Sequence, residues 1–257
     1  MEIRNAEVLI TGANRGIGLA IAKMCAREKA KLHLVMRSEE TALIPELELL
    51  GAQSVKIWIA DLSHKEQVEN LLHQLSHTPI EILINNAGLL TGGLLEEQPL
   101  DDVYSMFQVN LVSLVHLTRG LLPQMIKQGK GKIVNNSSVS AIMHFPCAST
   151  YAASKAAVLA FNNCLNIELK GTGVSTLCLI TPGIKTRMFD DIENKYGKNF
   201  EVPSDYMDAD QYAQLIGESI KNDDEYLRPS GMTQIGINVA RYLPQLFKWE
   251  AGRRFRR

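Results

Sequence analysis

Tyr151 and Lys155 stand four residues apart in the alanine-rich segment Tyr151–Lys170, which predicts that both side chains lie on one face of a helix. A lysine ammonium beside a phenol favours the phenolate. At about 5 Å and an effective dielectric of about 20, the Coulomb energy is about 3 kcal/mol, or about two pKa units. A phenol shifted in this way could transfer a proton near neutral pH, as a general acid or base does.

Two further polar residues are expected close to this pair. Ser138 ends the fifth strand-like run, thirteen residues before Tyr151, and could hydrogen-bond a substrate carbonyl. Asn110 lies in the apolar helical stretch Phe107–Leu117, where a lone amide needs a partner. It could hold a water that connects Lys155 with solvent, or it could be a core residue whose amide is satisfied locally.

A glycine-rich turn joins the first strand-like run to the first helix-like run. The turn Thr11–Gly18 has the glycine spacing G-x3-G-x-G. Glycines let the backbone turn tightly and approach a pyrophosphate, which then binds at the N-terminus of the following helix. Nucleotide binding is therefore predicted here, although glycine-rich turns also occur without a ligand.

The end of the second strand-like run, Leu34–Ser38, indicates which nucleotide. A carboxylate there would hold a ribose 2′-hydroxyl and repel a 2′-phosphate. The run carries no acid and ends in Arg37 and Ser38, and Arg15 in the glycine turn can reach the same region. Two cations favour NADP(H) over NAD(H). The alternative is that Arg37 is only a solvated charge at the end of the strand. Glu39 and Glu40 follow closely, and they keep this alternative open.

Polar residues also follow the third and fourth strand-like runs. Asp61 could accept a hydrogen bond from the adenine amino group. The loop Asn85–Gly88 could pack beside the adenosine ribose. Each could instead be ordinary turn chemistry.

Strand-like and helix-like segments alternate along the chain and must position these residues. The strand-like runs are Glu7–Thr11, Leu32–Met36, Val55–Ala60, Ile80–Ile84, Lys132–Asn135 and Val174–Ile180. The helix-like runs are Ile17–Arg27, Leu43–Leu50, Val68–Leu75, Asp101–Ile126, Tyr151–Lys170 and Asp208–Lys221. The α/β alternation predicts a Rossmann-type doubly wound parallel sheet of about seven strands, with helices on both faces, in a single domain over residues 1–257. Ligands of such sheets bind beyond the carboxyl ends of the strands, where the polar residues above fall.

Within this domain, residues 1–135 are predicted to bind mainly the cofactor, and residues 136–257 to form the catalytic and substrate-binding part. Residues 184–210 are expected to be an irregular insertion, and 238–247 a helix. The last ten residues, 248–257, hold five basic residues and one acid. They predict a solvated basic tail, with contact to an anionic membrane surface or a partner chain as the alternative.

Composition argues against several other classes of protein. Hydrophobic residues make up 46 % and charged residues 21 %, and the net charge of −1 gives no attraction to nucleic acid. The four cysteines are scattered without disulfide or metal-ligand spacing, so no metal site is expected. A signal-peptide pattern and an apolar run of roughly 20 residues are both absent, so a cytoplasmic location is expected.

Together these residues resemble the short-chain dehydrogenase/reductase (SDR) family, in its short single-domain branch. The resemblance covers about residues 5–188, and its elements stand in family order: Thr11–Gly18, Asp61, Asn85–Gly88, Asn110, Ser138, Tyr151, Lys155 and Pro182-Gly183. It implies an NADP(H)-dependent oxidoreductase that interconverts a carbonyl and a secondary alcohol by hydride transfer to or from the nicotinamide.

The resemblance also implies individual roles. Tyr151 is the general acid/base and Ser138 orients the substrate oxygen. Lys155 binds the nicotinamide ribose and lowers the pKa of Tyr151, while Asn110 completes a proton relay. The implied cofactor contacts are Gly12, Asn14, Arg15, Gly16, Ile17, Gly18, Arg37, Ser38, Asp61, Leu62, Asn86, Ala87, Gly88, Tyr151, Lys155, Pro182, Gly183, Ile184 and Thr186.

Two departures from the family pattern affect these expectations. Two residues separate Gly183 from Thr186, where many members have three, which weakens the predicted contact of Thr186 with the nicotinamide amide. The C-terminal part lacks the glycine-rich ending of 3-oxoacyl reductases, which argues against that substrate class. It also makes a tetramer through that end less expected than a homodimer through the two long helices.

The substrate pocket is expected to be mainly apolar. Beside Ser138, the loop residues predicted to face the substrate are Leu89, Leu90, Met143, His144, Phe145, Met188 and Phe189. They favour a hydrophobic small-molecule carbonyl or alcohol, although they could equally be packing residues. Two other functions stay open: a regulator that binds NADP(H) without turnover, and a sugar-nucleotide epimerase or dehydratase. The intact serine, tyrosine and lysine argue against the first, and the chain length against the second.

Overall fold

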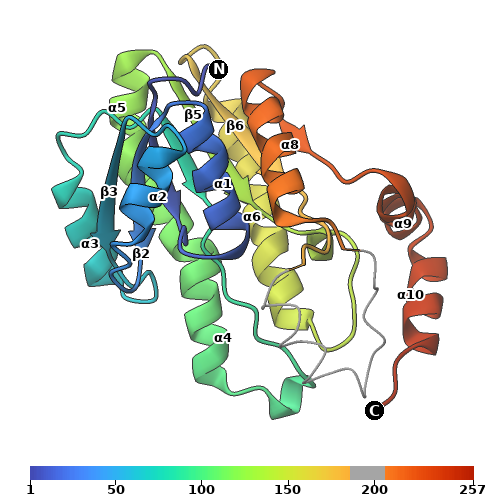
Figure 1. Cartoon of the computed structure of the whole chain (residues 1–257). Helices are drawn as coiled ribbons and strands as arrows, with labels where there is room; N and C mark the ends of the chain where they lie inside the picture. Colours follow the sequence, from blue (N-terminus) through green and yellow to red (C-terminus); the bar gives the residue numbers. More distant parts are fainter. Residues whose placement is uncertain (186–205) are drawn as a thin grey trace.

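The computed structural model of the protein describes residues 1–185 and 206–257 and contains one seven-stranded parallel sheet (Figure 1). The strands run in the order β3-β2-β1-β4-β5-β6-β7, so the winding direction reverses between β1 and β4. They are β1 (Glu7–Thr11), β2 (Lys31–Met36), β3 (Ser54–Ile59), β4 (Ile82–Asn85), β5 (Gly131–Asn136), β6 (Val174–Leu179) and β7 (Tyr226–Leu227). The predicted Rossmann-type doubly wound sheet in a single domain is confirmed.

Helices cover both faces of the sheet. Because side chains alternate along a strand, Val8 and Ile10 of β1 enter one core cluster and Leu9 enters the other. The first cluster packs under α1 (Gly16–Arg27), α2 (Leu43–Leu49) and α8 (Ala209–Lys221). The second packs under α3 (Lys65–Gln74), α5 (Ser113–Gln128) and α6 (Ser149–Glu168). Burial on both faces explains why the central strands are continuous apolar runs.

The long helix predicted at Asp101–Ile126 is divided. A π-helical turn, η2 (Gln108–Val112), joins α4 (Leu100–Phe107) to α5. Such turns are rare and are frequent at functional sites. Asn110 stands at the centre of this one.

The C-terminal part differs from the expectation of one helix and a solvated tail. Two helices, α9 (Gly231–Tyr242) and α10 (Pro244–Arg253), follow β7, so residues 248–253 of the predicted tail are helical. The prediction of one continuous helix over 238–247 is wrong, because α9 ends at Tyr242. Leu243 has a non-helical backbone, with φ of −130° and ψ of 56°. The cause is Pro244, which disfavours helical backbone in the residue before it but is well suited to begin a new helix.

Other expectations near this end have different outcomes. Of the insertion expected at 184–210, residues 186–205 lie outside the described residues, and so do Thr186, Met188 and Phe189. The helix predicted at Asp208–Lys221 is confirmed as α8. Its N-cap is the Asp208 carboxylate, which accepts the backbone N–H groups of residues 210 and 211 at 2.9 and 3.2 Å.

Candidate active site

The four predicted catalytic residues come from three elements that meet at the carboxyl edge of the sheet (Figure 1). Ser138 follows the end of β5 at Asn136. Tyr151 and Lys155 occupy the first two turns of α6, and Asn110 comes from η2. Tertiary structure therefore brings together side chains from Asn110 to Lys155, which are 45 residues apart in the chain.

Tyr151 lies against Ser138 and Lys155. The Ser138 hydroxyl is hydrogen-bonded to the phenol, and Lys155 Nζ lies 5.8 Å from the centroid of the ring. Burial raises the pKa of Tyr151 to about 12, and the hydrogen bond to Ser138 offsets only part of that effect. The predicted shift of this pKa toward neutral pH is therefore wrong, because burial of the phenol outweighs the interactions that favour the phenolate.

The Lys155 ammonium is buried and has a fixed partner. Nζ donates to the backbone carbonyl of Asn136 at 2.8 Å. Burial lowers the pKa of Lys155 to about 8, which leaves the ammonium form dominant at neutral pH. A Cβ on Gly88 would lie 3.6 Å from this Nζ and 3.5 Å from Asn110 Oδ1. The loop after β4 therefore passes directly beside the lysine.

Two adjacent serines make different contacts. Ser137 Oγ donates to the Lys155 carbonyl at 2.8 Å and so ties α6 to the end of β5. Ser138 Oγ accepts the N–H of Ser140 at 3.1 Å, at the start of the short helix η3 (Val139–Ala141). This contact orients Ser138 Oγ beside the phenol of Tyr151, to which the hydroxyl is hydrogen-bonded.

The side-chain amide of Asn110 is fully partnered. Its Oδ1 accepts the N–H of Leu89 at 2.7 Å, and its Nδ2 donates to the carbonyl of Leu89 at 2.9 Å and to Ser154 Oγ at 3.1 Å. Ser154 Oγ in turn donates to the Tyr151 carbonyl at 2.8 Å. Asn110 thus joins the loop after β4 to the first turn of α6. The proton relay predicted for it stays a prediction.

The glycine turn between β1 and α1 is built for close backbone approach. Gly12 and Gly16 have φ of 66° and 54°, which other residues rarely adopt. A Cβ on Gly18 would overlap the carbonyl oxygen of Gly12. Asn86, which follows β4, holds the glycine turn in place. Its Nδ2 donates to the carbonyls of Thr11 and Gly12 at 3.0 and 3.3 Å.

The polar residues at the ends of β2 and β3 lie close together. Burial tends to raise the pKa of Asp61, but its hydrogen bonds to Ser63 and the positive charge of Arg37 together lower it. Arg37 is exposed. Asn14 Nδ2 donates to Glu40 Oε1 at 2.8 Å, so an acid also reaches the glycine turn.

The segment after β6 is held by backbone contacts. The carbonyl of Gly183 accepts the N–H of Met207 at 3.0 Å, and the N–H of Lys185 donates to the carbonyl of Met207 at 3.1 Å. Pro182, Gly183 and Ile184 therefore stay at the same edge of the sheet as β5 and α6.

Of the predicted substrate residues that are described, Ser138 is buried, His144 is exposed, and Leu89, Leu90, Met143 and Phe145 are half-buried. Met143 lies under α9, where a Cβ on Gly236 would come within 2.8 Å of its Cε. The Phe145 ring packs edge-on against Phe247 of α10, with centroids 5.7 Å apart. Packing and substrate contact are thus both compatible with these residues.

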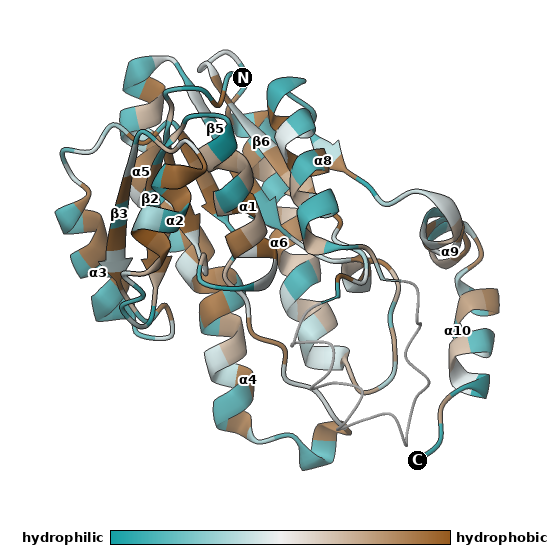
Figure 2. Cartoon of the chain, in the orientation of Figure 1, coloured by the Kyte–Doolittle hydropathy of each residue, from teal (hydrophilic) through white to brown (hydrophobic). Residues whose placement is uncertain are grey.

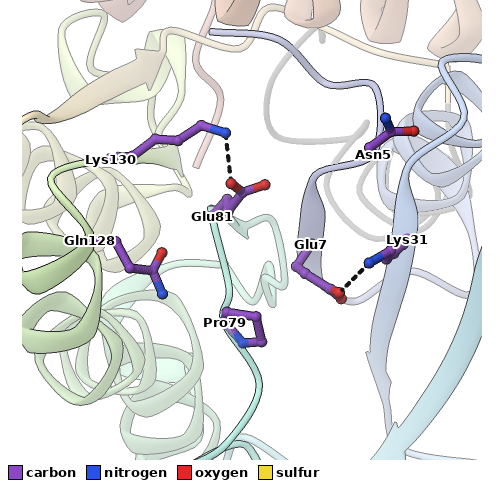
Figure 3. Close-up of a pocket in the computed structure, with 7 residues that line it drawn as sticks. All are labelled: Asn5, Glu7, Lys31, Pro79, Glu81, Gln128 and Lys130. Atoms are coloured by element: carbon purple, nitrogen blue, oxygen red, sulfur yellow. Dashed lines mark hydrogen bonds and ion pairs between the residues drawn. The ribbon is translucent and has the colours of Figure 1, made fainter.

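A hollow at the opposite edge of the sheet is not part of this site. Figure 3 shows that it lies at the amino ends of the strands, and it is lined by Asn5, Glu7, Lys31, Pro79, Glu81, Gln128 and Lys130. Its charges are already paired, Lys130 with Glu81 at 2.6 Å and Lys31 with Glu7 at 3.1 Å. Among the described residues, no group of three His, Cys, Asp or Glu side chains could hold a metal ion.

Comparison with known proteins identifies the family. A family model described as short chain dehydrogenase matches residues 6–197. The chain belongs to this family. An uncharacterized oxidoreductase of Bacillus subtilis (strain 168), YusZ, is 31 % identical over 237 residues, which cover 90 % of this chain and 83 % of YusZ.

Solved structures of short-chain dehydrogenases share the whole fold. The enzyme of Sphingobium yanoikuyae in complex with NADPH is 27 % identical, with a TM-score of 0.81 over 93 % of this chain and 94 % of that one. A short-chain dehydrogenase/reductase of Burkholderia phymatum in complex with NAD is 26 % identical, with a TM-score of 0.84 over 96 % of both chains.

The residues of this short-chain dehydrogenase fit an anionic dinucleotide. The first turn of α1 contains no acid, and its N-cap residue Arg15 makes no side-chain cap. The first N–H groups of a helix have no intrahelical partner, so they can bind a pyrophosphate at this end of the helix dipole.

Sequence analysis missed a polar chain beneath the short-chain dehydrogenase site. Asn136 Nδ2 donates to Asn86 Oδ1 at 3.2 Å, and Thr181 Oγ1 donates to Asn136 Oδ1 at 2.5 Å. The hydroxyl of Tyr212 in α8 lies 3.0 Å from Thr181 Oγ1 and is the last member of this series of hydrogen bonds. Asn86 was already an expected cofactor contact, and polar residues at the ends of buried strands are a signal that could also have found Asn136 and Thr181.

Proposed function

We propose that this short-chain dehydrogenase is an NADP(H)-dependent oxidoreductase that interconverts a carbonyl and a secondary alcohol on a hydrophobic substrate. The observation that carries the proposal is the contact of Tyr151 with both Ser138 and Lys155 at the carboxyl edge of the sheet. A phenol, a hydroxyl and an ammonium grouped at one point suit proton transfer to an oxygen.

In the reductive direction, Tyr151 donates its phenolic proton to the carbonyl oxygen of the substrate. Ser138 Oγ, held by the Ser140 N–H, donates a hydrogen bond to the same oxygen. The Lys155 ammonium stabilises the phenolate that remains, and Asn110 keeps the loop after β4 against α6. The nicotinamide, when bound, would supply or accept the hydride.

The cofactor would bind along the carboxyl edge. In this proposal the turn from Gly12 to Gly18 and the N-terminus of α1 hold the pyrophosphate, and Asp61 and Leu62 lie beside the adenine. Residues 86–88 pack beside the ribose, while Tyr151 and Lys155 hold the nicotinamide ribose. Pro182, Gly183, Ile184 and Thr186 complete the nicotinamide end.

The alternative proposal is a regulator that binds NADP(H) without turnover. A panel of apolar ketones, with a sugar ketone as the polar comparison, separates the two when consumption of NADPH is followed. Consumption with several apolar ketones supports the enzyme. Tight NADPH binding with no consumption across the panel would favour the regulator.

Arg37→Ala is expected to weaken NADPH binding about ten- to a hundredfold and to leave NADH binding nearly unchanged. Removing the guanidinium deletes a charge-assisted hydrogen bond to the 2′-phosphate, which NADH lacks. Titration of nicotinamide fluorescence with each cofactor measures this preference. Arg27→Ala, at the far end of α1, is the control. Equal affinities in wild type and variant would remove Arg37 from the site and return NAD(H) to consideration.

The direction of the reaction is expected to depend on pH. With a pKa of about 12, Tyr151 keeps its proton at neutral pH, the form that reduction requires. Alcohol oxidation requires the phenolate, so its kcat/KM should rise with pH through the alkaline range. Rate profiles in both directions between about pH 6 and pH 10 check this. An oxidation rate that falls as the pH rises would contradict it.

We further propose that the protein is a homodimer through α5 and α6. These helices carry an outward groove lined mostly by apolar side chains, among them Leu122, Pro123, Ile126 and Phe161. Light scattering after size exclusion measures the mass of the assembly, and a monomer would contradict the proposal.

A further inference from the structure

Positive charge is concentrated at the C-terminal end of the chain. Residues 228–257 contain seven of the 27 Lys and Arg residues but one of the 28 Asp and Glu residues. Glu250 is that acid, and it pairs with Arg253 and Arg254 at 2.9 and 2.8 Å. These pairs offset part of the charge, and the segment stays strongly positive in a protein whose net charge is −1.

The same segment exposes large apolar side chains. Figure 1 shows α9 and α10 to one side of the sheet, and Ile237 and Ala251 are the buried residues of the two helices. The exposed side chains are Met232, Ile235, Tyr242, Leu243, Leu246 and Trp249. Figure 2 shows hydrophobic and hydrophilic residues side by side along α10.

Trp249 has the surroundings of a residue at a membrane interface. It is 62 % exposed, and the Arg253 guanidinium lies 5.4 Å from its ring. Leu246, Trp249 and Arg253 share one face of α10 because they are three and seven residues apart. Tryptophan and arginine together suit the headgroup region, where an apolar ring and a cation are both accommodated.

These helices also adjoin the predicted substrate residues. Met143 packs under Gly236, and Phe145 packs against Phe247. At the chain end, Arg257 forms an ion pair with Glu96 of the short helix η1 (Leu95–Glu97), which belongs to the loop that follows β4. Helices α9 and α10 therefore lie against the loop that carries the predicted substrate residues Met143 and Phe145.

We propose that α9 and α10 dock the protein on an anionic membrane surface, beside the entrance for an apolar substrate. Negatively charged headgroups complement the arginines, and the apolar side chains enter the interface. A second copy of the chain fits less well, because a two-fold contact through this surface would place the same cations against each other. Docking is peripheral, since no described helix is long and apolar enough to cross a membrane.

Sedimentation with vesicles tests the docking directly. The full chain should bind vesicles of equimolar phosphatidylcholine and phosphatidylglycerol, and bind vesicles of phosphatidylcholine alone at least about tenfold more weakly. The variant with Arg253, Arg254, Arg256 and Arg257 changed to Gln should lose at least about tenfold in affinity for the anionic vesicles. Trp249→Ala should also weaken binding, and added salt should weaken it for the wild type.

A matched variant removes four cations from the body instead, by changing Lys29, Lys65, Lys127 and Lys170 to Gln. It should bind as the wild type does, and circular dichroism should show all variants folded. Wild-type protein that does not bind anionic vesicles, or binding that the arginine changes leave intact, would overturn the proposal. If the wild type does not bind vesicles and the arginine variant has a different assembly mass, the surface is instead a contact between copies of the chain, and the proposal is overturned.

Discussion

Tyr151→Phe is expected to lower kcat about a hundredfold to ten-thousandfold, while NADPH still binds with nearly wild-type affinity. The change removes one oxygen, which is the proton donor of the proposed reaction. Ser138 stays beside the ring position and can still orient the substrate, so KM should change much less than kcat. Initial rates with an apolar ketone, together with NADPH titration, separate the two effects.

The control for this variant is Tyr104→Phe. Tyr104 is exposed on α4, so the loss of its hydroxyl should leave both kcat and KM unchanged. A Tyr151→Phe variant that turns over at the wild-type rate would show that the phenol is not the acid. The group of Tyr151, Ser138 and Lys155 would then need another function.

Gly18→Ala is expected to weaken dinucleotide binding more than about tenfold and to destabilise the protein by about 1 to 3 kcal/mol. A Cβ at this position would overlap the carbonyl of Gly12 and crowd the amide of Asn86. Both neighbours belong to the turn that would hold the pyrophosphate, and a backbone carbonyl cannot rotate away as a flexible side chain can. Thermal unfolding and NADPH titration measure the two effects.

Gly252→Ala is the matched control, because a Cβ there meets nothing within 4 Å. Since alanine also favours helices more than glycine does, this variant should be as stable as the wild type or slightly more stable. Wild-type stability and affinity in Gly18→Ala would mean that α1 can shift away from the turn. The close packing of strand, turn and helix would then not be required for binding.

Six of the seven strands were predictable from local pattern alone, whereas β7 has only two residues, both half-buried, and gives no such pattern. Continuous apolar runs such as Val8–Ile10 are buried on both faces, and burial on both faces is a property of nearly every central strand in this fold. The place of Ser138 beside Tyr151 was also predictable. Parallel strands end at one edge, so residues that follow them must meet there.

Three features depended on contacts that no local pattern describes. The pKa of Tyr151 follows from its burial, and charge spacing along a helix does not report burial. The amide of Asn110 is satisfied by Leu89 and Ser154, from segments 21 and 44 residues away. The C-terminal helices divide at Pro244 and pack against Met143 and Phe145, although the last ten residues have the composition of a solvated tail.

The amino-acid sequence alone was thus sufficient for the family, the alternation of strands and helices along the chain, and the presence of polar residues at the carboxyl edge of the sheet. These follow from side-chain periodicity and from the chain order of short motifs. Tertiary structure decided which polar atoms are partnered, which ionisable groups are buried and which apolar side chains stay exposed. Desolvation and packing depend on distances between segments far apart in the chain, and those distances exist only in the folded protein.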